Sequence, residues 1–435
     1  MINYEQMYRE KLRTAEEIVS NIQSGYVCCC PTGTGEPEAI MNALTERVLK
    51  ENLNNIEHHL MLASRRWKYW APELAGKIKH VSWFTSGASR PVVQDGRADF
   101  MPGFFYENAV RWVKYVQEAD VFYAMVSPMD KHGYFSFGPA ASEAHAQMSV
   151  ARKVYIEVNP KVPRVLGDCF IHISQVDLLC ESSNPLPNLG ETVLNEKDIK
   201  IGELIAEHIP DGATIQLGIG GMPNAVGMKL MDKKDLGLHT EMFTDSMVVL
   251  MESGAVNNSK KNIHKGKTIA TFGVGSQSMY DFIDDNPAVE FYPVSYVNDP
   301  RVIAQNDNVI SINACVEVDF IGQVCSESIG AKNISGTGGQ VDFVRGANWS
   351  KGGKAFICTY STAKDDTISK IVPALATGAH VTTSKNDVDH IVTEYGIAAL
   401  KGKTAAQRAK ALIAVAHPAF RDKLTFEAKK MNLMV

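Results

Sequence analysis

Glu241 is the acidic side chain whose surroundings best suit chemistry. It lies in the segment DLGLHTEMFTDSMVVL, between His239 and Asp245, after a glycine-rich turn and shortly before the apolar run Met247 to Met251. This is a good position for a pocket carboxylate. From the motif alone, the favoured interpretation is that Glu241 caps or solvates the helix that follows. Asp245, and Glu394 in the segment VTEYG, are alternative carboxylates.

A glycine-rich turn precedes this carboxylate in the chain. The segment GIGGMP follows an apolar strand, and Pro223 suits the first turn of a helix. Backbone N–H groups there could face an anion such as a phosphate or a carboxylate. The turn is not a dinucleotide fingerprint, because Pro223 stands where the third glycine belongs, and no Walker lysine follows. Read alone, the glycines can also simply form a turn; they are Gly218, Gly220 and Gly221.

A second glycine-rich segment, SGTGGQVDFVRGA, runs from Ser335 to Ala347. Its first glycines would let backbone amides approach a ligand closely, as in an oxyanion hole. The alternative interpretation is a tight turn in which Asp342 and Arg345 are structural. The glycines concerned are Gly336, Gly338 and Gly339.

Other kinds of catalysis lack their usual motifs. No G-x-S-x-G elbow stands out, and the 12 histidines show no H-E-x-x-H or similar ligand spacing. Among the 8 cysteines there is no C-x-x-C pair. Cys28, Cys29 and Cys30 alternate faces in an expected strand and cannot converge on one metal ion. We therefore predict reduced core cysteines and no metal site.

Composition argues against nucleic-acid and membrane partners. A net charge of −5, with 45% hydrophobic and 21% charged residues, is typical of globular enzymes. No apolar run approaches the ~20 residues that cross a bilayer, and the segment from Met1 to Arg13 is polar. We expect a cytoplasmic protein without a membrane span or signal peptide. The densest basic cluster is too short to indicate nucleic-acid binding; it consists of Arg65, Arg66 and Lys68 beside Trp67 and Trp70.

The chain repeats itself at a nearly constant offset. GTGEPEAI resembles GIGGMPNAV, with 186 residues between Pro37 and Pro223. A D-x-x-G motif occurs at Asp130 and again at Asp319, 189 residues later. Four matches in the same order at nearly one offset indicate a duplicated domain, and the alternative is chance agreement of glycine and proline punctuation. Phe84 and Gly87 match Phe272 and Gly275. A helix with Ile18, Ile22 and Gly25 matches one with Ile205, Ile209 and Gly212. The first of these helices begins with a predicted capping box at Thr14 and Glu17.

The fold class follows from the pattern within each half. Short β-branched runs, such as Thr268 to Val274, alternate with helical patterns. This predicts an α/β protein of two similar open α/β/α domains with mostly parallel sheets. We place the boundary in Ser182 to Asp198, where two prolines interrupt the pattern, and predict domains 1–185 and 186–435. In such sheets ligands gather at the carboxyl ends of strands, which directs attention to the two glycine turns.

Six motifs in fixed order carry a resemblance to a known family. GIGGMPNAV, HTEMFTDS, YVNDP, EVDFIGQV, SGTGGQVDFVRGA and VTEYGIAALKGKT closely resemble the acetyl-CoA hydrolase/transferase family, a branch of the class I CoA-transferases. Within that family the chain is most similar to the 4-hydroxybutyrate and butyrate:acetate CoA-transferase members. The resemblance covers nearly the whole length, and it agrees with the duplication.

The resemblance implies roles for individual residues. Glu241, in the T-E-M segment, becomes the nucleophile, with Asn298 and Gly339 as oxyanion-hole donors. Gln323 and Gly338 are expected near the substrate. The first half departs from the second at Glu36. The resemblance implies that this half helps to shape the acid-binding side, with Glu36 as no more than a helix cap. The segment that borders coenzyme A is Gly218, Ile219, Gly220, Gly221 and Met222.

The function that the resemblance implies is transfer of coenzyme A between a short-chain acyl-CoA and a free carboxylate such as acetate. The expected intermediate is a γ-glutamyl thioester on Glu241, formed in a ping-pong mechanism. Two alternatives stay open, an acyl-CoA hydrolase and a non-catalytic protein that binds coenzyme A. Coenzyme A is expected as a substrate, with no permanently bound cofactor, and family members suggest a homodimer or homotetramer.

Overall fold

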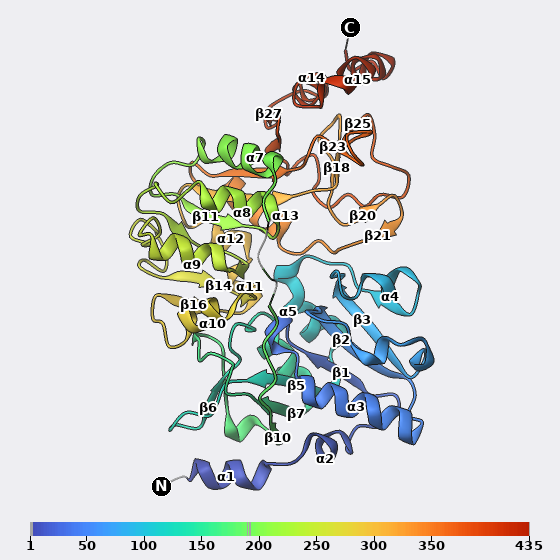
Figure 1. Ribbon diagram of the computed structural model, residues 1–435, viewed down its shortest axis with the longest axis vertical. Coiled ribbons are helices and arrows are strands. Elements are labelled where there is room, and N and C mark those ends of the chain that lie inside the picture. The colour runs from blue at the N-terminus through green and yellow to red at the C-terminus, as the bar shows by residue number, and fades with distance from the viewer. Residues whose placement is uncertain (1–2, 189, 191–192, 435) are drawn as a thin grey trace. The chain divides into compact units, whose positions relative to one another are not determined.

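The computed structural model describes residues 3–188, 190 and 193–434 (Figure 1). Of the predicted boundary segment, Leu189, Glu191 and Thr192 lie outside the described residues. The chain forms two compact units. The first contains Met1–Gly190, Phe243–Asp245 and Ile269–Val297, and the second contains Glu191–Met242, Ser246–Thr268 and Asn298–Val435. The units are therefore not two continuous halves of the sequence.

The first unit is built on a 7-stranded sheet in the order β10-β7-β5-β1-β2-β3-β4, paired in parallel throughout. Its apolar runs form buried strands, as expected of a parallel sheet covered by helices. The strands are β1 (Val27–Cys30), β2 (Ile56–Leu62), β3 (Ile78–Phe84), β4 (Ala98–Phe100), β5 (Ala119–Val126), β7 (Ala151–Val158) and β10 (Leu178–Glu181). The helices include α1 (Tyr4–Lys11), α2 (Ala15–Val19), α3 (Glu38–Glu51), α4 (Arg90–Gln94), α5 (Asn108–Arg111), α6 (Ala144–Val150) and α10 (Gln277–Ile283).

The second unit has a 6-stranded sheet in the order β12-β11-β17-β22-β26-β27, in which only β27 runs antiparallel to its neighbour. Its strands are β11 (Thr214–Leu217), β12 (Gly237–Leu238), β17 (Val309–Ala314), β22 (Lys354–Cys358), β26 (His390–Thr393) and β27 (Gly396–Ala399). Its helices include α7 (Glu196–Ala206), α8 (Gly221–Met228), α12 (Pro300–Ile303), α13 (Gln340–Trp349), α14 (Ala405–Ala414) and α15 (Pro418–Lys430). Among the described residues, no helix combines the length and apolar character needed to span a membrane.

Strand order confirms the predicted duplication. In the first unit β10, β7, β5, β1 and β2 are neighbours, and β26, β22, β17, β11 and β12 follow one another in the second. The order in which successive strands are added thus reverses at the same place in each sheet, between β1 and β5 and between β11 and β17. Such a switch point is where open α/β sheets usually bind ligands, and the two glycine turns follow β1 and β11.

The repeated D-x-x-G motif forms the same turn in both units. Oδ1 of Asp130 accepts backbone N–H groups from residues two and four positions later, at 2.8 and 3.0 Å. Oδ1 of Asp319 makes the corresponding bonds at 3.1 and 2.8 Å. Gly133 and Gly322 have φ angles of 83° and 87°, which favour glycine. The sequence match therefore reflects one local structure present twice.

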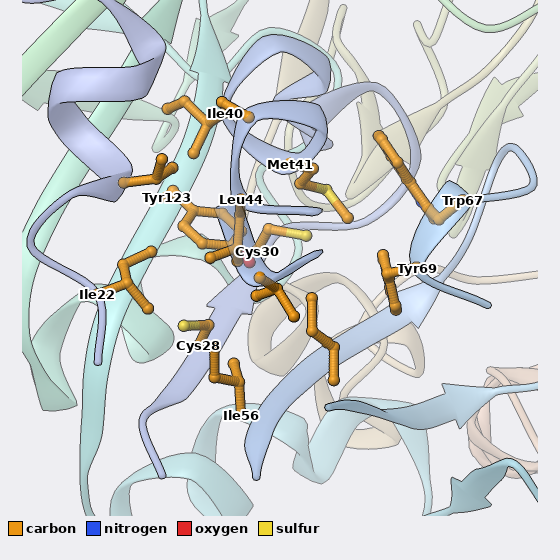
Figure 2. Packing of buried hydrophobic residues seen from close by; sticks show 14 of the residues in the cluster. Ile22, Cys28, Cys30, Ile40, Met41, Leu44, Ile56, Trp67, Tyr69 and Tyr123 are labelled. Atoms are coloured by element: carbon orange, nitrogen blue, oxygen red, sulfur yellow. The ribbon is translucent and has the colours of Figure 1, made fainter. Parts of the chain in front are cut away.

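The core of the first unit forms where α2 and α3 cover β1 and β2. Cys28 and Cys30 join this apolar cluster, whereas Cys29 points to the opposite face of the sheet, as strand alternation requires. The predicted capping box of Thr14 and Glu17 begins α2. All 8 cysteines are buried and free. Figure 2 labels Ile22, Cys28, Cys30, Ile40, Met41, Leu44, Ile56, Trp67, Tyr69 and Tyr123 of this cluster.

Candidate active site

Glu241 follows the carboxyl end of β12 in the second unit. Strand β12 pairs in parallel with β11, and the N–H of His239 continues the ladder by donating to the carbonyl of Ile215 at 3.2 Å. The buried ring of His239 packs edge-on against Phe343 of α13, with 6.3 Å between ring centroids. These contacts fix the segment from which Glu241 projects, at the edge of the sheet that also carries the turn after β11.

Two donors hold the Glu241 carboxylate. Nδ2 of Asn298 donates to Oε2 of Glu241 at 2.7 Å, and the backbone N–H of Gly339 donates to the same carboxylate. Asn298 is 0% exposed, and it directly precedes α12, whose N-cap Asp299 accepts the N–H of Arg301. The structure thus brings together the three residues that the sequence predicted for catalysis.

Position 339 requires glycine because the site has no room for a side chain there, not because of its backbone angle. Its φ is −93°, which any residue can adopt. A Cβ atom at this position, however, would overlap both Oε2 of Glu241 and Nδ2 of Asn298. The neighbouring Gly338 has φ +54°, which lets the loop turn sharply into α13. The two glycines of this segment therefore serve different purposes.

Burial determines the acidity of Glu241. The side chain is partly exposed, but surrounding protein raises its pKa to about 7, while the bonds from Asn298 and Gly339 act in the opposite direction. A carboxyl group with a pKa near neutrality is ionised in an appreciable fraction of molecules and is less heavily solvated than a surface carboxylate. Perturbed pKa values of this kind are common at functional sites.

The alternative carboxylates take part in local structure. Asp245 accepts the backbone N–H of Ser276 at 3.1 Å and also its hydroxyl group. Glu394 accepts the N–H and the hydroxyl of Ser361, at 2.9 and 2.7 Å. Lys197 lies 3.7 Å from Glu394. Of the three carboxylates, Glu241 therefore has the environment that suits a nucleophile.

The turn from Gly218 to Met222 leaves β11 at the switch point and enters α8. The N–H of Gly218 donates to the carbonyl of Ile312 at 2.8 Å, which ties the turn to β17. Gly220, the N-cap of α8, has φ 117° and is exposed, and Ile219 is 50% exposed. An exposed turn that leads into a helix can present N–H groups to an anion.

A polar cluster that the sequence analysis missed supports this turn. Oε1 of Gln216 accepts from the hydroxyl of Ser311 at 2.8 Å and from Nδ2 of Asn313 at 3.1 Å. All three side chains are buried at the carboxyl ends of β11 and β17. Alternate polar residues at the ends of two otherwise apolar strands were the signal that could have found them.

The start of α13 is anchored by residues that also escaped the sequence analysis. Nε2 of Gln340 donates to the carbonyl of Ala314, at the end of β17, at 2.9 Å, and its Oε1 accepts from the hydroxyl of Ser326 at 2.7 Å. The backbone carbonyl of Glu327 accepts the N–H groups of residues 334 and 335. These bonds fix the loop that delivers Gly339 to Glu241.

Gln323, another predicted site residue, takes part in a local turn. Nε2 of Gln323 donates to Oδ2 of Asp319 at 2.7 Å, so this amide closes the D-x-x-G turn. A contact between substrate and that amide would require the bond to be exchanged. Within the described part of the chain, no group of three or more His, Cys, Asp and Glu side chains could hold a metal ion.

The prediction that Glu36 caps a helix is wrong. Glu36 is 1% exposed, and its carboxylate accepts the N–H of Ser64 at 2.6 Å and Nε1–H of Trp67 at 2.7 Å. Burial raises its pKa to about 7. The residue that caps α3 is Glu157 of β7, which accepts the N–H groups of Ala39 and Ile40 at 2.8 and 3.2 Å. Both contacts join residues far apart in sequence, which local reasoning could not foresee.

Comparison with known proteins agrees with this geometry. Residues 1–187 match the model of the acetyl-CoA hydrolase/transferase N-terminal domain, and residues 275–428 match that of the C-terminal domain. The chain belongs to the acetyl-CoA hydrolase/transferase family. Glu241 lies between the two matched segments, and Asn298 and Gly339 lie in the second.

Similar members of the acetyl-CoA hydrolase/transferase family align over almost their full length. A succinyl-CoA:cyclohexane-1-carboxylate CoA transferase of Geobacter metallireducens is 49% identical, with 99% of this chain and 98% of the relative covered. A 4-hydroxybutyrate coenzyme A transferase of Clostridium kluyveri is 48% identical, with 99% and 100% covered. The crystal structure of RipA from Yersinia pestis superposes with a TM-score of 0.94 at 38% identity, over 99% of this chain and 100% of that one.

Proposed function

We propose that this protein is a CoA-transferase that moves coenzyme A from a short-chain acyl-CoA to a free carboxylate through covalent catalysis by Glu241. The observation that carries the proposal is the pair of hydrogen-bond donors, Asn298 and Gly339, that meet at the Glu241 carboxylate. The names of the relatives support transfer as the reaction type. Acetate is our choice for one of the acids.

In the first step the carboxylate of Glu241 attacks the thioester carbonyl. The carbon–sulfur bond breaks, coenzyme A leaves as a thiolate, and the acyl group stays on Glu241 as a mixed anhydride. The thiolate then attacks the γ-carbonyl of the same glutamate, which releases the acyl group as a free acid and leaves a γ-glutamyl thioester. A second carboxylate reverses both steps, so no oxidant, reductant or water is consumed.

Each attack passes through a tetrahedral intermediate with a negative oxygen. The N–H groups that hold the resting carboxylate, from Asn298 and Gly339, are positioned to stabilise such oxygens. One well-placed donor of this kind typically lowers the barrier by ~3 kcal/mol. Both donors are fixed before the reaction by α12 and α13, so little rearrangement is needed.

The turn Gly218–Met222 is our candidate for contact with coenzyme A. Its exposed backbone at the switch point suits a phosphate or a polar pantetheine group. Binding energy from this remote part of the substrate can be used to orient the thioester at Glu241.

Trapping the intermediate tests the proposal. The enzyme is incubated with butyryl-CoA, reduced with borohydride, and digested for mass spectrometry. We expect the modified peptide to carry the reduced thioester on Glu241. Modification of Asp245 or Glu394 would overturn the assignment. Asp245→Asn and Glu394→Gln are the matched controls, and both should still be labelled at Glu241.

A second measurement separates transfer from hydrolysis. Release of free coenzyme A from butyryl-CoA is followed without acetate, and formation of acetyl-CoA is followed after acetate is added. A transferase forms acetyl-CoA and releases little free coenzyme A. Equal release with and without acetate would identify a hydrolase.

A further inference from the structure

Asp342 contacts the active-site amide directly. Its Oδ2 accepts from Nδ2 of Asn298 at 3.2 Å, and the same nitrogen donates to Oε2 of Glu241 at 2.7 Å. Asp342 and Asn298 are both 0% exposed. The two N–H bonds of one amide group are therefore divided between two carboxylates, one that the proposed reaction modifies and one that it leaves unchanged.

The amide group of an asparagine side chain has two ends of almost identical shape, its oxygen and its NH2 group. One end donates two hydrogen bonds, and the other only accepts them. If the Asn298 amide rotated by half a turn, its oxygen would face the carboxylates of Glu241 and Asp342, and the donor would be lost. Oδ1 of Asn298 is buried and has no hydrogen-bond partner among the residues that the structure describes, so the orientation rests on what the nitrogen contacts.

Only one of the two carboxylates is covalently modified during the proposed reaction. This inference rests on the proposed function, in which Glu241 becomes an anhydride and then a thioester. In both forms Glu241 has lost its negative charge. The carboxylate of Asp342 takes no part in these bonds. It is the acceptor that can hold the Asn298 nitrogen in place while Glu241 is acylated.

We propose that Asp342 is a positioning residue, which keeps the N–H end of Asn298 directed at the reacting carbonyl throughout the catalytic cycle. Its place in the fold suits this role. Asp342 is the third residue of α13, and Gly339 is the N-cap of the same helix. One helix start therefore supplies a direct donor through Gly339 and orients the second donor through Asp342. An acidic residue in the first helical turn is itself favoured by the helix dipole.

A double-mutant cycle tests this role with the full-length enzyme. Asp342→Asn, Asn298→Ala and the combined variant are compared with the parent for kcat and KM with butyryl-CoA and acetate. Asn298→Ala should lower kcat by about 100-fold to 1000-fold and leave measurable activity through Gly339. Asp342→Asn should lower kcat by about 10-fold to 100-fold with KM unchanged, because an asparagine no longer selects the nitrogen.

The decisive result comes from the combined variant. We expect Asp342→Asn to have no further effect on kcat once Asn298 is alanine. The same fold-loss in both backgrounds would show a purely structural role and overturn the inference, as would a parental kcat in Asp342→Asn. If that variant does not fold, Asp342→Ser, which keeps an uncharged acceptor oxygen, replaces it in the cycle.

The control variant is Asp389→Asn. Asp389 is also buried, and it accepts the N–H of Ala355 at the start of β22, the opposite end of the strand from the site. This variant should lower thermal stability and leave kcat unchanged. The cycle is independent of thioester mapping: a label on a residue other than Glu241 refutes the proposed function, whereas additive losses refute the role of Asp342 alone.

Discussion

Position 339 has no room for a side chain beside Glu241, since a Cβ atom there would overlap Oε2 of the carboxylate. We predict that Gly339→Ala displaces Glu241 and lowers kcat by about 100-fold, the typical effect of a displacement of ~1 Å at a reacting group. Steady-state kinetics with butyryl-CoA and acetate measure the loss. Circular dichroism should show an intact fold. A variant with parental kcat would mean that the site is wider than the structure indicates.

The pH dependence of the first half-reaction should reflect Glu241. Its pKa is raised by burial to about 7, and the attacking species is the ionised form. We therefore expect kcat/KM for the acyl-CoA to rise with pH and level off above about 7. Initial rates of butyryl-CoA consumption at saturating acetate, measured from about pH 5 to 9, check this. A profile that is already flat at about pH 5 would contradict the raised pKa.

The same raised pKa predicts that Glu241 reduces stability. A carboxyl group whose pKa is higher in the folded state than the ~4.3 of an unfolded chain binds more protons when folded, so its unfavourable contribution develops as pH rises between those two values. Glu241→Gln should therefore raise Tm by a few degrees at pH 8 and leave it nearly unchanged at pH 4. Scanning calorimetry of both proteins at both pH values measures the difference. An increase that is equal at both would implicate packing instead.

Glu36 should be important for the stability of the first unit. Replacing it with leucine leaves the N–H of Ser64 and Nε1–H of Trp67 without their acceptor. The expected cost is about 1–3 kcal/mol in the free energy of unfolding. Urea denaturation measures this, and Trp67→Phe in the Glu36→Leu background should recover part of it. A neutral Glu36→Leu variant would refute the proposed importance of these bonds.

The cysteines should be unreactive in the folded protein. All 8 are buried and free, and burial raises the pKa of the Cys28 and Cys30 thiols well above the ordinary range. N-ethylmaleimide should therefore neither label nor inhibit the native enzyme, whereas 8 labels should appear by mass spectrometry after unfolding in urea. Rapid labelling of the native protein would show that one of these residues is accessible.

Local patterns made much of this structure predictable. The D-x-x-G turns of Asp130 and Asp319 and the capping box of Thr14 depend on neighbours within a few residues, which a sequence displays directly. The repeat in the sequence predicted the duplication, and the matching strand order of the two sheets confirms it. The family resemblance implied Glu241, Asn298 and Gly339 as site residues, and the structure places them in contact.

Contacts between distant residues account for what was missed. Asp342 was one option for a purely structural residue, yet its partner Asn298 lies 44 residues away. Glu36 meets Trp67 across 31 residues. The segment Ile269–Val297 was assigned to the second half because it matches the repeat there, although in three dimensions it belongs to the first unit. Sequence periodicity carries no information on such pairings.

The capping of α3 by Glu157 distinguishes the glycine turn of the first unit from the matching turn of the second. In the first unit the glycine turn after β1 is buried, and the helix that follows already holds an anion, the carboxylate of Glu157 from β7 of the same sheet. In the second, β22 contributes no acidic side chain, and the equivalent turn stays exposed. The first turn is thus closed by the protein's own carboxylate, whereas the second keeps its backbone at the surface of the unit.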